Sequence, residues 1–501
     1  MRSKNAFKNL IFYIVYEVLV FVLGIVFPRL IILTYGSEIN GLTSTITRVL
    51  SLINLIQAGA VGAAIFQMYK PVAENDFETQ SAIIYSSKKF YRIVSAVYLA
   101  SSLAVGLFYS FYLADKNLAV LEIFLSFLIL SVNGANALLF NSICDIYISS
   151  HQKRYLLSIS FTCEQFVRYT LLLVVIVFKA PFVFIYLCYL FGGLVSVFLN
   201  TLFYHKLSKN TISKKPINRN FVIPNRKYLM LSSIGSEMIT ASPAIIITTF
   251  IGLAYSSVFS VYSMVFTSMK TLLNSIQLSF SAIFGNLTKT SSEDKIFRTH
   301  SAIELLTIFL GTIASCCVAF LIVPFIKIYT FGADMNYLYT TLAIFVVVYV
   351  VVFSFRTSFG YVATVYGLFK YTCIIVMIFA CFGVVLSILL TILFGLPYVM
   401  VGLIVNQLGC SIAILIVLKR KIPWFRCSKL FIRAGLMVAL VSLTIFLYFA
   451  LQPKIDSWIQ WIIYGVIVFS ISFIVLISYC LLFERPSLSL LLKHAKTIFK
   501  K

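Results

Sequence analysis

The sequence predicts an all-α, polytopic membrane protein with about fourteen transmembrane helices. Of its 501 residues, 61% are apolar and only 11% are charged, whereas about a quarter of the residues in a soluble protein are charged. The apolar residues form continuous blocks, such as Leu10–Leu33, Val120–Ser142 and Trp461–Phe483. Most blocks reach the roughly 20 apolar residues that a helix needs to cross a bilayer core. Their continuity argues against amphipathic surface helices.

The spans follow from these blocks in chain order. The first is preceded by the basic stretch "MRSKNAFKN", but its apolar run is too long for a signal peptide and lacks a cleavage site, so it is a retained helix. The predicted limits are 9–33, 39–67, 91–113, 118–148, 157–178, 181–204, 229–253, 257–285, 301–325, 338–366, 372–394, 398–418, 431–451 and 459–483.

The distribution of Lys and Arg predicts the orientation of the spans. With the N-terminus inside, the cytoplasmic segments hold 31 of these residues and the outer loops hold 4. Cytoplasmic loops carry the excess of basic residues, so both termini should be cytoplasmic. The net charge of +24 then reflects topology and attraction to anionic lipid headgroups, with no nucleic-acid partner. The tail "SLSLLLKHAKTIFKK" is typical of a helix that lies on the bilayer surface.

An internal repeat appears when the chain is shifted on itself by 220 residues. Between Tyr13 and Gln57, twelve of 45 positions are identical to their counterparts, among them Glu17 with Glu237. The shift spans six helices, so the copies share one orientation and predict two parallel six-helix halves, an arrangement that transporters use. The predicted domains are an N-terminal half over 1–204, a basic cytoplasmic linker over 205–228, a C-terminal half over 229–418, and two additional helices with the tail over 419–501.

Motifs of covalent chemistry are missing from the sequence. The ten cysteines fall mostly within apolar blocks and lack metal-ligand spacing. There is no nucleophile triad, P-loop or dinucleotide motif, and no outer loop is large enough for a membrane polymerase or ligase. We therefore expect no enzyme activity, no catalytic residue, no cofactor and no metal site.

Ionisable residues inside spans are costly and mark candidate sites. Arg48, Lys270 and Arg356 lie deep in their spans and are predicted to line a cavity that suits an anionic ligand; pairing with Glu17 or Glu237 is the structural alternative. Arg29 is a further candidate, although it could reach the outer headgroups instead. Glu164 and Arg168 are spaced i,i+4 and predict an ion pair within one helix. Glu122 and Glu304, at span ends, are left out of the candidate set.

Amide side chains in the paired second helices of the two halves could contact sugar hydroxyls. The alternative is that they form hydrogen bonds between helices. The candidates are Asn54, Gln57, Asn274 and Gln277.

The stretch "FPRLIILTYGSEINGLTSTITRVLSLINLIQAGAVGAAIFQMYKP" (27–71) carries a family resemblance. A helix ending in "YG", then "INGL", a polar second helix and "YKP" resemble the Wzx-type polysaccharide repeat-unit flippases of the multidrug/oligosaccharidyl-lipid/polysaccharide exporter (MOP) superfamily. The resemblance implies a MATE-like fold in a bacterial cytoplasmic membrane. It also implies that the chain moves an undecaprenyl-pyrophosphate-linked oligosaccharide to the outer leaflet, for capsule, O-antigen or exopolysaccharide assembly.

The same resemblance implies partners and roles. The cations at Arg48, Lys270, Arg356 and Arg29 would receive the pyrophosphate, and a polymerase with a chain-length regulator would use the exported unit. Glu17 and Glu237 would couple transport to H⁺ or Na⁺, or balance charge. Two alternatives from the same superfamily are a peptidoglycan-precursor lipid flippase, which would share a cationic cavity, and a multidrug exporter, whose cationic substrates would favour an acidic cavity.

Overall fold

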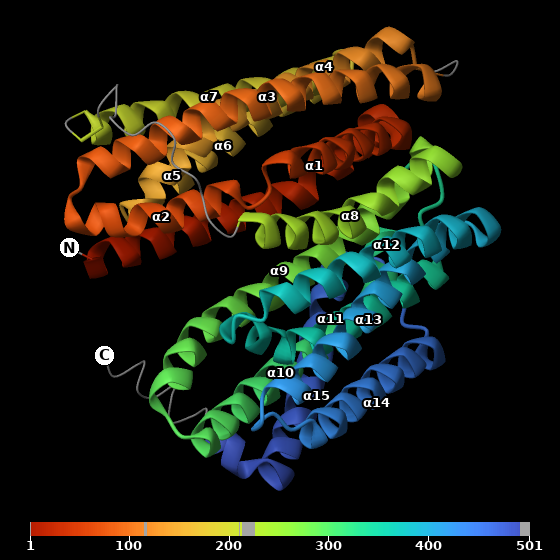
Figure 1. The fold of residues 1–501 in the computed structure, drawn as a ribbon. Helices are drawn as coiled ribbons and strands as arrows, with labels where there is room; N and C mark the ends of the chain where they lie inside the picture. Colours follow the sequence, from red (N-terminus) through yellow and green to blue (C-terminus); the bar gives the residue numbers. More distant parts are fainter. Residues whose placement is uncertain (1, 115–117, 210, 213–225, 491–501) are drawn as a thin grey trace. The chain divides into compact units, whose positions relative to one another are not determined.

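The computed structural model is a bundle of long helices (Figure 1). It describes residues 2–114, 118–209, 211–212 and 226–490, and no strand occurs among them. The predicted linker falls mostly outside the described residues, as does the end of the tail. The all-α fold class that the apolar blocks predict is therefore confirmed.

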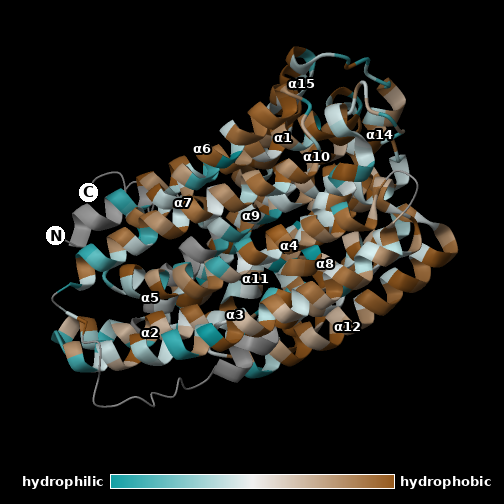
Figure 2. Ribbon diagram, turned by 90° about the horizontal axis from the view of Figure 1, so that it is seen from above, coloured by the Kyte–Doolittle hydropathy of each residue, from teal (hydrophilic) through white to brown (hydrophobic). Residues whose placement is uncertain are grey.

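The helices identify a multi-pass membrane protein. Eleven helical segments among the described residues are long and apolar enough to cross a membrane. Large apolar side chains are exposed along them, for example Val177 (74%), Leu393 (70%) and Phe446 (66%). Figure 2 shows apolar residues along most of the length of these helices. Such extended apolar surface is suited to lipid. The count of fourteen spans stays a prediction.

The chain divides into two compact units, Met1–Glu237 and Met238–Lys501. The first unit contains α1 (Arg2–Ile53), η1 (Asn54–Gln57), α2 (Ala60–Glu74), α3 (Phe77–Leu113), α4 (Val120–Asn136), η2 (Ala137–Asn141), α5 (Ser142–Ser150), α6 (Tyr155–Val177), α7 (Val183–Ser208) and the start of α8 (Arg226–Phe250). The second unit contains the rest of α8, α9 (Leu253–Thr290), α10 (Glu293–Tyr329), α11 (Thr340–Val365), α12 (Phe369–Phe394), η3 (Leu396–Tyr398), α13 (Val399–Lys421), α14 (Ser428–Leu451) and α15 (Trp458–Phe483).

In the first unit, α6 packs along α7 and α1, and α3 packs along α4 (Figure 1). Small residues allow the close approaches. A Cβ added at Gly193 on α7 would overlap the side-chain amide of Asn133 on α4, so a larger residue there would require this amide to move. Small residues at helix contacts are characteristic of membrane proteins, in which packing replaces the hydrophobic effect as the force between helices.

In the second unit, α12 and α13 pack side by side (Figure 1). Gly402 on α13 faces α12 so closely that an added Cβ would lie 2.1 Å from the carbonyl oxygen of Gly383. α10 packs against α9, α11, α14 and α15. The two C-terminal helices are thus attached to the second unit through α10.

Helix interruptions modify the predicted limits. The predicted first two spans are joined into α1 across a kink at Gly36, where φ is 85° and ψ is 171°. Pro28 stays within the helix. The span predicted as continuous over 39–67 is broken after Ile53, because Gly59 takes a left-handed conformation before α2 begins. The apolar pattern over 39–67 predicts a continuous helix through this glycine.

Candidate functional site

Two interruptions of regular helix come together in the first unit. The first follows α1, where the chain forms the 3-10 turn η1 over Asn54–Gln57. Gly59 then has φ 73° and ψ −6°, a conformation that a residue without a Cβ adopts at little cost. The second is η2 (Ala137–Asn141), a π-helical turn between α4 and α5. Such turns are frequent at functional sites.

Both interruptions line one cavity of about 410 Å³, which we call the first-unit cavity. Its volume is in the range of small-molecule sites. Apolar surface comes from residues such as Leu50, Leu138 and Phe161. The polar surface comes from the hydroxyls of Thr47, Ser51, Tyr98 and Ser142, the amides of Asn54, Gln57 and Asn141, and the carboxylate of Asp145. Irregular backbone at membrane depth is tolerated where it lines such a cavity.

The amides of the cavity differ in how fully they are bonded. Asn141 is held by α7, since its Nδ2 donates to Ser196 Oγ at 3.3 Å and its Oδ1 accepts from Asn200 at 3.0 Å. Gln57 Nε2 donates to Asn54 Oδ1 at 3.1 Å, but Gln57 Oε1 is buried without a hydrogen-bond partner among the described residues. An unpaired buried acceptor costs about 1–3 kcal/mol. A ligand that donates an O–H or N–H would remove this cost.

The predicted site residues of the first unit divide into two groups. Asn54 and Gln57 both line the first-unit cavity, and their predicted contact with sugar hydroxyls stays a prediction. Arg48, Arg29 and Glu17 lie half-buried on α1 and are not part of the cavity lining. Glu237 is half-buried on α8, at the last position of the first unit. The roles that the sequence suggests for these residues stay predictions.

In the second unit, Lys270, Asn274 and Gln277 lie half-buried on α9. Gln277 faces α11: its Nε2 is 3.5 Å from the place that a Cβ of residue 360 would occupy. Arg356 lies on α11 and is also half-buried. Whether these cations and amides share one cavity stays a prediction.

Arg356 is positioned by a neutral group. Its Nη1 donates to Oε1 of the buried Gln407 at 2.6 Å, and Gln407 Nε2 donates to Tyr349 Oη at 3.4 Å. No acidic side chain among the described residues forms an ion pair with Arg356. By contrast, Arg168 Nη1 lies 3.7 Å from Glu164 Oε1, which confirms the predicted i,i+4 pair. The Arg356 guanidinium is therefore oriented but keeps its full charge for another partner.

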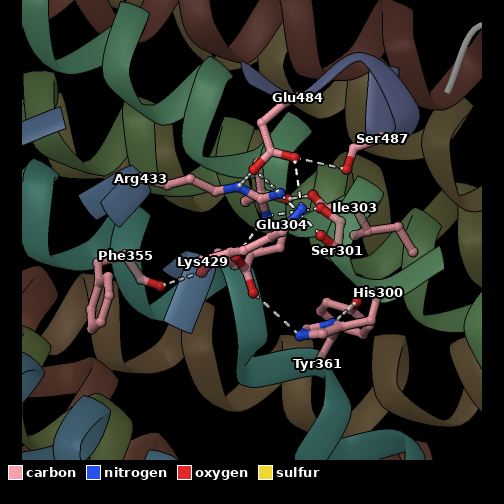
Figure 3. A network of polar contacts seen from close by, with 12 residues as sticks. His300, Ser301, Ile303, Glu304, Phe355, Tyr361, Lys429, Arg433, Glu484 and Ser487 are labelled. Atoms are coloured by element: carbon pink, nitrogen blue, oxygen red, sulfur yellow. Dashed lines mark hydrogen bonds and ion pairs between the residues drawn. The ribbon is translucent and has the colours of Figure 1, made fainter. Parts of the chain in front are cut away.

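A buried ion network in the second unit was missed by the sequence reasoning (Figure 3). Arg433 on α14 is 1% exposed at its side chain and makes five hydrogen bonds. It donates to Glu304 Oε1 at 2.7 Å, twice to Glu484 Oε1 at 3.2 and 2.9 Å, and to the backbone oxygen and Oγ of Ser301. A guanidinium has five N–H donors, so every one is used. The network joins α10, α14 and the end of α15.

His300 extends the network toward α11. Its Nδ1 lies 2.7 Å from Tyr361 Oη, and its Nε2 lies 3.4 Å from Glu304 Oε2. The ring is enclosed by the aromatic side chains of Phe284, Trp424 and Phe425. The i,i+4 spacing of His300 and Glu304 was the one local signal of this cluster.

Glu484, which follows α15, is the charged member of the network closest to the C-terminus in sequence. Burial by itself raises the pKa of its carboxyl, but the charge of Arg433, the hydrogen bonds from Arg433 and Ser487, and the charge of Lys429 outweigh burial. The net effect holds the pKa of Glu484 below its usual value. The ionised form is thus the one that the folded protein stabilises.

Comparisons with known proteins identify solved structures that have a similar fold. No protein-family model matches the chain, and no curated protein matches it significantly. Among solved structures, the chain is similar to the lipid II flippase MurJ in an inward closed conformation, with 14% identity, coverage of 92% of this chain and 98% of that chain, and a TM-score of 0.68. It is also similar to a multidrug resistance MATE family transporter of the MOP superfamily, with 11% identity, coverage of 83% and 94%, and a TM-score of 0.62.

A third structure, of MATE in a bent conformation, has 12% identity, coverage of 85% and 93%, and a TM-score of 0.53. The chain therefore has the fold of MOP superfamily transporters, as the MATE-like prediction expected. At these identities the likeness concerns the fold, and the substrate must be argued from the residues of this chain.

Proposed function

We propose that this protein is a flippase that moves an undecaprenyl-pyrophosphate-linked oligosaccharide from the inner to the outer leaflet of a bacterial cytoplasmic membrane. The observation that carries this proposal is the first-unit cavity. A chain that is 61% apolar has gathered three amides and four hydroxyls around a space of about 410 Å³. Groups of this kind bind sugar hydroxyls, which cannot cross hydrocarbon unaided.

The environment of Arg356 supports the proposal that the same ligand has an anionic portion. A guanidinium that is oriented by Gln407 and has no described acidic partner retains a charge that is costly within a membrane. A phosphate or pyrophosphate group would offset this cost through charge-assisted, bidentate hydrogen bonds. Arg48, Lys270 and Arg29 are proposed to contribute to the same attraction.

Transport by alternating access fits the fold. In transporters built from two parallel halves, the halves move against each other around a substrate site and expose it to each leaflet in turn. No covalent step is required of the protein. We propose that both termini are cytoplasmic, that H⁺ or Na⁺ coupling involves Glu17 or Glu237, and that a polymerase and a chain-length regulator act on the exported unit.

Two other substrates remain alternatives within the proposal. A peptidoglycan-precursor lipid has the same division into pyrophosphate and sugar, and a solved structure with this fold is titled a lipid II flippase. A cationic drug would be attracted by Asp145, although the seven neutral polar groups of the cavity favour a polyhydroxylated ligand.

The test is to delete the gene in its host and to measure lipid-linked repeat units in each leaflet with an oxidant of sugars that does not cross membranes. Deletion should confine the units to the inner leaflet, and the wild-type gene should restore outer labelling. Arg356→Gln should reduce outer labelling at least tenfold, with Arg356→Lys and the exposed Lys70→Ala as controls. Arg48→Ala and Lys270→Ala test the other cations.

Unchanged outer labelling after deletion would contradict the proposal. A growth arrest with accumulated peptidoglycan precursor would assign the alternative lipid. Increased drug sensitivity with normal surface polysaccharide would assign drug export.

A further inference from the structure

The first-unit cavity contains one carboxylate and no basic residue. Asp145 lies on α5, one turn after the π-helical turn η2, and is half-buried. The lining includes no Lys, Arg or His. A cavity of this composition is negatively charged, whereas the cations that the sequence predicts for an anionic ligand lie elsewhere.

The carboxylate is held in place without being neutralised. Ser149 Oγ donates to Asp145 Oδ1 at 2.5 Å, which fixes the side chain from the next turn of the same helix. Asp145 forms no ion pair with a described residue. Lys88 of α3 lies with its Nζ 5.4 Å from the ring centroid of Tyr204 instead. Asp145 Oδ2 is therefore left to a ligand or to water.

The neighbouring amides also favour a ligand that donates hydrogen bonds, as the free oxygen of Asp145 does. Gln57 Oε1 is a buried acceptor without a partner among the described residues. A sugar hydroxyl, an amide N–H or a protonated amine could donate to Gln57 Oε1 and to Asp145 Oδ2. A carboxylate on the sugar can donate to neither of them when it is ionised, and it would meet Asp145 as a like charge.

We infer that the first-unit cavity is a sugar-selecting subsite in which Asp145 admits neutral, N-acylated or amine-bearing sugars and excludes uronic and other acidic sugars. This inference rests on the proposed function, because it assigns the glycan of the transported lipid to the cavity. Rejection through a like charge is a common means of specificity, since it penalises the wrong ligand without strengthening the right one. The pyrophosphate is common to all substrates and does not contribute to this choice.

The experiment uses the purified full-length protein in liposomes. The probes are fluorescent short-chain prenyl pyrophosphates that carry one hexose, one N-acetylhexosamine, one hexosamine or one hexuronic acid. The wild type should move the hexuronic acid probe at least tenfold more slowly than the hexose probe. Asp145→Asn preserves the shape of the side chain and removes its charge, so it should reduce the ratio of the hexose rate to the hexuronic acid rate to about twofold.

Glu78→Gln is the matched control, because Glu78 is an exposed acidic residue of the same unit that lies outside the cavity lining. It should leave the ratio of the two probes unchanged. The wild-type comparison needs no variant, so it tests the inference even if Asp145→Asn fails to fold.

Three outcomes would overturn the inference. Equal wild-type rates for hexose and hexuronic acid, or an unchanged ratio in Asp145→Asn, would remove Asp145 from selection while leaving transport established. Equal loss of all four probes in a folded Asp145→Asn protein would assign Asp145 to transport itself. No movement of any probe by the wild type would overturn the proposed function together with this inference.

Discussion

The first-unit cavity and the buried ion network of the second unit are both polar regions within apolar helices, yet they are built in opposite ways. In the network, all five N–H groups of Arg433 are used and its acidic partners are enclosed. In the cavity, Gln57 Oε1 lacks a hydrogen-bond partner among the described residues, and Asp145 has one hydrogen bond and no ion pair with any of them. The guanidinium of Arg433 is fully satisfied within the protein, although His300 Nε2 at the edge of the network has no hydrogen-bond partner among the described residues, whereas the cavity leaves Gln57 Oε1 unsatisfied.

This difference separates structural polarity from functional polarity. A satisfied network fixes which helices pack together, as Arg433 does for α10, α14 and the end of α15. An unsatisfied cavity keeps polar groups available at a cost in stability, a cost that is consistent with a site for a ligand. Arg356 resembles the cavity groups in one respect: it is available for a ligand. Gln407 orients its guanidinium but does not neutralise its charge.

The largest expected effect is on the network. Arg433→Ala would leave Glu304 and Glu484 buried without their counter-charge, and we expect a loss of about 3–5 kcal/mol in stability. The measurement is the fraction of purified protein that stays monodisperse after heating in detergent. The exposed Arg485→Ala is the control and should change little.

A combined variant sharpens this test. Arg433→Met together with Glu304→Gln and Glu484→Gln removes all three charges, so it should be more stable than Arg433→Ala alone. If Arg433→Ala were as stable as the wild type, the network would not hold the C-terminal helices, and the contrast with the cavity would fail.

The second prediction is that a substitution of Arg356 impairs transport and leaves stability nearly unchanged, whereas Arg433→Ala mainly lowers stability. Arg356→Gln should lower transport of the proposed lipid at least tenfold, because the charge that attracts the pyrophosphate is lost. Its stability should stay within about 1 kcal/mol of the wild type, since no acidic residue in the described part of the chain forms an ion pair with Arg356. Transport into the outer leaflet and the fraction that stays monodisperse after heating are measured on the same preparations. A loss of stability equal to that of Arg433→Ala would show that Arg356 has a structural role.

The sequence predicted the helices because apolar blocks are local signals that need no knowledge of tertiary contacts. It also predicted the Glu164–Arg168 pair, whose partners are four residues apart. It could not predict the partners of Arg433, because Ser301 and Glu304 lie 132 and 129 residues away in the chain. Arg433 is one of the 31 basic residues that the charge distribution predicts to be cytoplasmic, and Glu304 lies at a predicted span end, outside the candidate set.

Two of the predicted site residues lie in the first-unit cavity, and their contact with a ligand stays a prediction. Asn54 and Gln57 were selected because they recur in the repeat, and both line the first-unit cavity. Asp145 is not among the predicted site residues, because it lies near the end of the span predicted over 118–148. The break at Gly59 and the π-helical turn η2 turn these side chains toward one space, and neither has a signal in the apolar pattern.

A smaller effect is expected from the amides of the cavity. Asn54→Ala removes one of several hydrogen-bonding groups, so transport should fall about threefold, which is less than the tenfold effect of a 1.4 kcal/mol change. Stability should stay within about 0.5 kcal/mol, because Asn54 is exposed to the cavity. Thr47→Ala, at an exposed lining position, is a matched comparison. If Asn54→Ala were destabilised, Asn54 would have a structural role, as the residues of the buried ion network do.

The smallest effect is expected from acid titration of the network. The pKa of Glu484 is lower in the folded protein than its ordinary value of 4.5, so its ionisation stabilises the fold above about pH 4.5, and this contribution is lost as the pH falls through the lower, folded value. Wild-type thermal stability should therefore decline below pH 4.5, and Glu484→Gln, which lacks the titrating group, should decline less over the same range. The two proteins should differ by a constant amount between pH 6 and pH 8. If the thermal stability of both proteins declined in parallel in acid, the network would not stabilise the ionised carboxylate of Glu484. The distinction between a satisfied network and an unsatisfied cavity would then rest on Arg433 alone.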